Sequence, residues 1–104
     1  MILGTDGSRY DRIGKHLHYQ TKGKGGMIRF FNGALYDNNK PIGHVVGETI
    51  CLPDCSVIKK VDDTIFYGQI SYKLEDEKMI GPGKVWFGVT NDWDALRIVL
   101  KETV

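Results

Sequence analysis

The stretch that decides the fold class runs from Met27 to Val46 and reads MIRFFNGALYDNNKPIGHVV. Asn32-Gly33 lies between two apolar segments and is a strong β-hairpin signal, because both residues accept the positive φ of a type I′ turn. Residues 37–39 form a second polar turn, since Asp and Asn side chains readily bond nearby backbone groups. The stretch therefore predicts three antiparallel strands joined as a meander.

Alternating or β-branched residues predict further strands on both sides of this meander. These segments are residues 15–20, 48–52, 56–61, 64–74, with Gly68 as a bulge or bend, and 84–90. We detect no internal repeat. Short strands separated by frequent turn signals predict an all-β or β-rich α+β fold, namely an antiparallel barrel or sandwich of six to eight strands.

Three segments allow more than one interpretation. Residues 1–14 are polar and could be a mobile N-terminal arm, and the glycine-rich residues 22–26 predict a flexible loop. Asn91 or Asp92 could cap a helix that runs to Lys101. We favour a single helical turn at 92–95 followed by a strand at 96–101, because apolar residues alternate there, and keep the C-terminal helix as the alternative.

Length, charge and hydropathy limit the function classes. The chain has 104 residues, which favours one domain, and its net charge of +1 gives no global field for nucleic acid or membranes. Residues 1–40 nevertheless carry a charge of +4 and residues 41–104 carry −3, so the first part could form a modest anion-binding surface. We find no membrane-spanning run and no signal peptide, and therefore expect a cytoplasmic protein.

Part of the chain resembles a known family. The segment ALYDNNKPIG at 34–43, followed by Phe66-Tyr67 and by KVWF at 84–87, is similar to bacterial SH3-like and S-layer-type wall-binding modules. The resemblance covers residues 34–90 and implies an SH3-like barrel that binds peptidoglycan, proline-rich segments or wall polymers through an aromatic groove. It implies four groove residues, whose alternative role is in the core: Tyr36, Tyr67, Trp86 and Trp93.

The histidines suggest a catalytic alternative. His16 and His18 share one face of a predicted strand, because side chains at i and i+2 point the same way. With His44 as a general acid and Lys24 or Arg29 stabilising a phosphorane-like transition state, they have the residue types of a metal-independent ribonuclease. No acidic partner is fixed by spacing, so two exposed histidines without a catalytic role are the simpler interpretation.

The two cysteines allow a metal hypothesis. His16, His18, Cys51 and Cys55 are the ligand types of a His₂Cys₂ zinc site, although a Cys-x₃-Cys spacing around Pro53 is not the usual one. Two reduced thiols are the favoured interpretation. We therefore expect no cofactor.

Our main hypothesis is a non-enzymatic binding or adaptor module that recognises a protein or polymer through exposed aromatic side chains. The alternatives are the small nuclease and an inhibitor that acts by occlusion. Basic and aromatic residues interleave at Arg9-Tyr10, His18-Tyr19 and Arg29-Phe30, so a nucleic-acid partner is a further option. Exposed sheet edges would also allow an edge-paired dimer.

Overall fold

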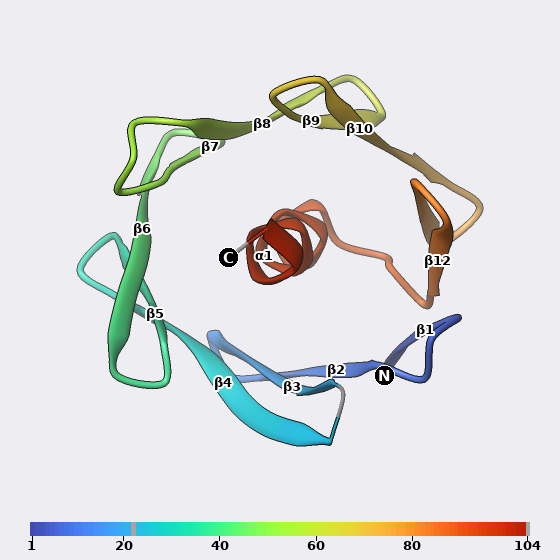
Figure 1. Cartoon of the computed structure of the whole chain (residues 1–104), viewed down its shortest axis with the longest axis horizontal. Helices are drawn as coiled ribbons and strands as arrows, with labels where there is room; N and C mark the ends of the chain where they lie inside the picture. The colour runs from blue at the N-terminus through green and yellow to red at the C-terminus, as the bar shows by residue number, and fades with distance from the viewer. Residues whose placement is uncertain (22, 104) are drawn as a thin grey trace.

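The computed structural model describes residues 1–21 and 23–103, which form a closed antiparallel barrel with a helix, α1, inside it (Figure 1). The described residues contain twelve strands and one helix. These are β1 (Ile2–Gly4), β2 (Arg9–Ile13), β3 (His16–Thr21), β4 (Lys24–Phe31), β5 (Ala34–Asp37), β6 (Lys40–Val46), β7 (Thr49–Cys51), β8 (Val57–Val61), β9 (Thr64–Tyr67), β10 (Ile70–Glu75), β11 (Lys78–Gly81), β12 (Lys84–Phe87) and α1 (Asp92–Thr103).

Each strand pairs with its neighbours in the chain, and β1 pairs with β12 to close the barrel. The predicted meander is confirmed as β4, β5 and β6, and both turn residues have positive φ, 50° at Asn32 and 78° at Gly33. Every described strand is paired on both sides. The edge-paired dimer considered from the sequence therefore has no free edge on which to form.

The core has a regularity that we did not detect in the sequence. Each strand directs at least one nearly buried side chain into the barrel, and most of these residues follow one another at intervals of seven or eight positions. In chain order they are Ile2, Tyr10, Leu17, Ile28, Leu35, Ile42, Ile50, Ile58, Ile65, Tyr72, Met79 and Trp86, each at most 6% exposed. Together these residues form an apolar ring around the interior, and further inward side chains such as Tyr19 and Tyr67 extend it.

The helix fills the space inside this ring. Eight strands already enclose an interior that side chains just fill, so twelve strands leave room for a further element. Asn91 begins the helix as a cap, because its Oδ1 accepts the backbone N–H groups of Trp93, at 2.8 Å, and Asp94, at 3.2 Å. The buried residues of α1 include Ala95, Leu96, Ile98, Val99 and Leu100.

The predicted strand at 96–101 is wrong, and the alternative of a C-terminal helix is correct. Leu96, Ile98 and Leu100 alternate because the helix is surrounded by the barrel, so apolar residues occur around most of its circumference. With 12 residues, α1 is shorter than a membrane-spanning helix, and no helix in the described part of the chain is long and apolar enough to cross a membrane.

The all-β class with a C-terminal helix is confirmed, but twelve strands replace the expected six to eight, and the barrel is not of the SH3-like type. The segment 64–74 is a hairpin rather than one strand, because Gly68 adopts a φ of 60° and turns the chain between β9 and β10. Asp76 and Glu77 also have positive φ and turn the chain into β11.

The N-terminal segment is part of the barrel. Residues 1–14, which we considered as a mobile arm, contribute β1 and β2, and Tyr10 is fully buried. Of the predicted loop at 22–26, Lys22 lies outside the described residues, and Lys24–Gly26 begin β4. The first residues of the chain therefore contribute to the core.

Candidate binding surface

The end of the helix is fixed inside the barrel by two groups of polar residues. In the first group, Lys101 Nζ lies 3.1 Å from Asp37 Oδ2 and 4.4 Å from the centre of the Tyr19 ring, and the Tyr19 hydroxyl donates to Asp37. Burial and the hydrogen bond to Asp37 raise the pKa of Tyr19. Burial disfavours the charge of Lys101, but the hydrogen bond and charge of Asp37 outweigh it and raise the pKa of Lys101.

The second group surrounds Glu102. Tyr10 Oη donates to Glu102 Oε2 at 3.0 Å, and Lys84 Nζ lies 2.8 Å from Glu102 Oε1 and 2.6 Å from Asp6 Oδ2. Burial raises the pKa of Tyr10, and the charge and hydrogen bond of Glu102 raise it further. Burial would raise the pKa of Asp6, but its bonds to Lys84 and Ser8 hold that pKa well below its usual range. These groups satisfy one another and position the helix.

A buried ion pair fixes the first half of the helix. Arg97 is fully buried; its Nη2 donates to Asp94 Oδ1 at 2.8 Å and its Nη1 donates to the backbone oxygen of Lys15 at 3.1 Å. The guanidinium lies 4.8 Å from the centre of the Trp93 ring, whose edge contact with Phe30 spans 5.5 Å between ring centres. Burial lowers the pKa of Arg97, and the charge of Asp94 opposes this effect. Trp93 therefore packs the helix against β4.

The four aromatic residues of the expected groove do not come together. Trp86 is 2% exposed in the core, and Tyr67 packs against the core beside Ile58, its partner across β8 and β9. Tyr36 alternates with the buried Leu35 and therefore faces outward. The expectation of one groove built from Tyr36, Tyr67, Trp86 and Trp93 is wrong, because Trp86 and Tyr67 point into the barrel and Tyr36 points away from it.

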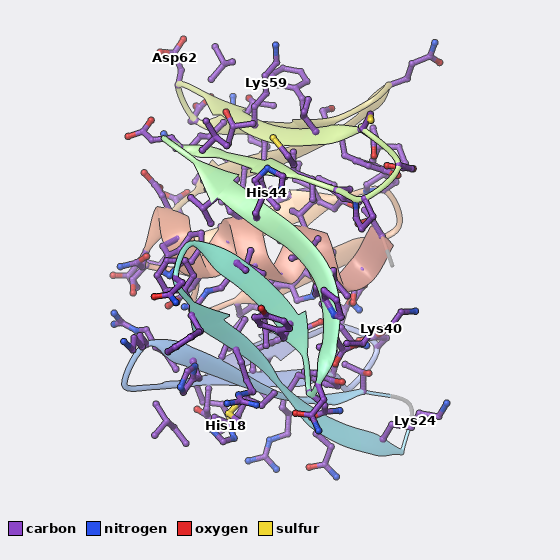
Figure 2. All side chains as sticks on the ribbon, turned by 90° about the vertical axis from the view of Figure 1, so that its left-hand side faces the viewer. His18, Lys24, Lys40, His44, Lys59 and Asp62 are labelled. Carbon is purple, nitrogen blue, oxygen red and sulfur yellow. The ribbon has the colours of Figure 1, made fainter. Side chains whose placement is uncertain are left out.

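The histidines are also separated. His16 and His18 share the outer face of β3, as predicted, and His16 Nδ1 accepts the backbone N–H of Phe30 at 3.2 Å. His44 lies on β6, and β4 and β5 stand between β6 and β3. At the usual strand spacing, β6 is therefore roughly 14 Å from β3. Figure 2 shows His18 and His44 well apart on this side of the barrel. The predicted acid–base arrangement of His44 with His16 or His18 is therefore wrong.

The four candidate zinc ligands are even farther apart than the histidines. Cys51 ends β7 and Cys55 lies in the next loop, so three strands stand between them and His16 and His18 on β3. Within residues 1–21 and 23–103, no group of three His, Cys, Asp or Glu side chains could hold a metal ion. The four residues do not form the hypothesised site.

The outer side of β3 to β6 has a distinctive charge, and we call it the basic face. Asp37 is the only carboxylate in these four strands, and it contacts Lys101 at the end of the helix. Figure 2 looks toward this side, with Lys24 and Lys40 near one end and His44 farther along. In the described part of the chain, Lys24, Arg29 and Lys40 form no ion pair.

Two aromatic side chains and a guanidinium form the centre of the basic face. Phe31 is 61% exposed, and Arg29 and Tyr36 are direct cross-strand partners. Together with Asn39 they line a shallow hollow of about 180 Å³, and Arg29 Nη1 donates to Asn39 Oδ1 at 3.1 Å. The sequence offered one signal for Phe31: of two consecutive aromatic residues in a strand, only one can face the core.

The opposite charge gathers where the helix begins. Two hollows of about 290 and 240 Å³ share Asp92, and their other acidic lining residues are Glu48, Glu75, Asp76 and Glu77. One lysine lines each hollow: Lys78 the larger, and Lys60 the smaller, with its Nζ 3.4 Å from Asp92 Oδ2. The molecule therefore separates a positive outer face from a negative barrel end.

In comparisons of the chain with protein-family models, curated proteins and solved structures, no match was found.

Proposed function

We propose that the protein is a non-enzymatic binding module that holds an extended anionic polymer on the basic face. The single observation that carries this proposal is the composition of β3 to β6, where the only carboxylate, Asp37, is paired with Lys101. Arg29 lies on the outer face, whereas Lys24 and Lys40 lie at the ends of β4 and β6, near one end of the barrel (Figure 2). None of the three forms an ion pair among the described residues. A partner with repeated negative charges would find these cations beside a single carboxylate, Asp37, which already pairs with Lys101.

The aromatic side chains support the same surface. Phe31 exposes most of its ring beside Arg29 and Tyr36, and isolated exposed apolar residues on a monomer need no functional explanation. Here the ring lies next to a second aromatic residue and a guanidinium in a shared hollow. This combination provides both contact area and charge, as binding surfaces enriched in aromatic residues and Arg do.

The nuclease and the inhibitor considered from the sequence have less support. A nuclease needs an acid and a base close to one phosphate, whereas His44 is separated from His16 and His18 by two strands. An inhibitor that acts by occlusion needs a target surface, and no feature of the described residues selects one. We therefore propose binding without catalysis.

The test is retention on immobilised heparin, a polymer that carries anionic groups and no bases. Arg29→Ala and Lys40→Ala should elute at lower salt than the wild type, because they remove a cation from the basic face and one from its end, respectively. Lys78→Ala is the matched control, since it removes the same charge from β11 on another side of the barrel, and it should elute close to the wild type. Equal losses in all three variants, or no retention of the wild type, would contradict the proposal.

A further inference from the structure

We propose that the polymer is a single-stranded nucleic acid whose bases stack on Phe31 and Tyr36 while its phosphates contact Lys24, Arg29 and Lys40. This inference rests on the proposed function and specifies its substrate class. It depends on the aromatic rings, because charge alone would serve any polyanion, whereas exposed rings add affinity only for a polymer with planar groups.

The strand register places the stacking and charged groups in one connected set. Arg29 and Tyr36 are directly opposed on β4 and β5, and Phe31 lies two residues beyond Arg29 on the same side of β4. Directly opposed side chains in an antiparallel pair are about 5 Å apart, and diagonal ones about 7–8 Å. Two rings and a guanidinium thus lie within reach of neighbouring nucleotides.

Arg29 is suited to contact both bases and phosphates. Its guanidinium is planar, stacks on aromatic faces and presents several donors that match phosphate oxygens. One donor, Nη1, is used by Asn39 at 3.1 Å, and this bond orients the group within the hollow. Its remaining donors have no partner among the described residues, so they are available to a phosphate.

A single strand fits this face better than a duplex. The basic face is the outside of a barrel and, in the described residues, carries neither a helix nor a projecting ribbon that could enter the major groove. Bases in a duplex also hide their flat faces, whereas an unpaired strand exposes them to Phe31 and Tyr36. The acidic hollows around Asp92 would repel a strand that left this face.

An acidic peptide is the competing partner of similar charge. It could pair with Lys24, Arg29 and Lys40, but a run of carboxylates has no flat groups to stack on the two rings. Removing a ring would then change its affinity little. Loss of affinity at Phe31 therefore distinguishes the two partners.

The experiment measures fluorescence anisotropy of labelled single strands of about 12 nucleotides, one of deoxythymidine and one of uridine, within the lengths that small barrels cover. The two arms show whether DNA or RNA is preferred. Further arms use a duplex of equal length and a polyglutamate peptide.

Phe31→Ala and Tyr36→Ala should each weaken single-strand binding about tenfold. Phe87→Ala, which removes a ring that is 51% exposed on β12, is the matched control and should bind like the wild type.

Three outcomes would overturn the inference: unchanged binding in Phe31→Ala and Tyr36→Ala, a duplex bound as tightly as the single strand, or polyglutamate bound as tightly. In any of these cases, charge-dependent retention on heparin would still support the proposed function of binding an anionic polymer. If the protein bound no anionic polymer at all, both the proposed function and the single-strand inference would be contradicted. Thermal unfolding followed by circular dichroism confirms that each variant is folded, which we expect because both wild-type rings face outward.

Discussion

Arg97 and Asp94 form an ion pair inside the barrel, with 2.8 Å between Nη2 and Oδ1, and the Arg97 side chain is fully buried. Arg12 Nε approaches the other oxygen of Asp94 at 3.6 Å from β2. The pair lies within α1, and the approach of Arg12 together with the bond from Arg97 to the backbone oxygen of Lys15 connects it to the barrel wall.

We expect Asp94→Asn to destabilise the protein by about 3–5 kcal/mol, because it leaves the Arg97 guanidinium buried without its counter-charge. Urea unfolding measures this loss. Asp92→Asn is the control: Asp92 is 66% exposed and pairs with Lys60 at the surface, so its removal should cost less than about 1 kcal/mol. Equal losses in the two variants would show that the buried pair has no special role.

Truncating a buried side chain of α1 should also lower the stability of the protein. Ile98 is fully buried where α1 fills the barrel, and Ile98→Ala should lower the free energy of unfolding by about 2–5 kcal/mol. Val46→Ala removes an apolar side chain that is 57% exposed and should have a much smaller effect. A loss below 1 kcal/mol for Ile98→Ala would mean that the helix does not fill the interior as described.

Stability should fall in alkaline solution. Burial holds the pKa of Tyr10 above its ordinary value of 10.0, so the unfolded chain loses this proton at lower pH than the folded protein does. The stabilisation is complete below pH 10 and is lost as pH rises from there toward the raised pKa. Urea unfolding between pH 8 and 11 should show the decline, and Tyr10→Phe should make it shallower. An unchanged slope in Tyr10→Phe would assign the decline to other groups.

Binding to a single strand should depend on salt according to the number of phosphates contacted. Three cations, Arg29 on the basic face and Lys24 and Lys40 at its end, predict a slope of log affinity against log salt of about −2, and Arg29→Ala should reduce its magnitude by about 0.7. Anisotropy titrations at several salt concentrations give both slopes. Lys78→Ala should keep the wild-type slope; a reduction equal to that of Arg29→Ala would place the phosphates elsewhere.

The sequence predicted the local hairpins well where their turn residues are specific. Asn32-Gly33 defined the β4–β5 turn, and the alternation in β3 correctly placed His16 and His18 on one face. The hairpin at Asp76-Glu77 was missed because Asp and especially Glu rarely adopt positive φ, so a charged run there predicted only a loop. This missed turn, the turn at Gly68 and the strands β1 and β2 within residues 1–14 explain the low strand count.

The helix and the binding surface needed information that local patterns do not contain. Leu96, Ile98 and Leu100 alternate like a strand, and only the width of a twelve-stranded barrel explains a helix that is buried around most of its surface. The resemblance to wall-binding modules implied a groove position for Trp86, with the core as the alternative, and sequence could not choose because aromatic residues serve both. Phe31 and Tyr36 became neighbours only through the register of β4 with β5.

The most direct test of the central claim is the location of amide chemical-shift changes when a single-stranded oligonucleotide is added to the isotopically labelled protein. We expect the largest changes in β3 to β6, around Arg29, Phe31 and Tyr36. Changes concentrated in β10 to β12, or around the hollows beside Asp92, would contradict a binding site on the basic face.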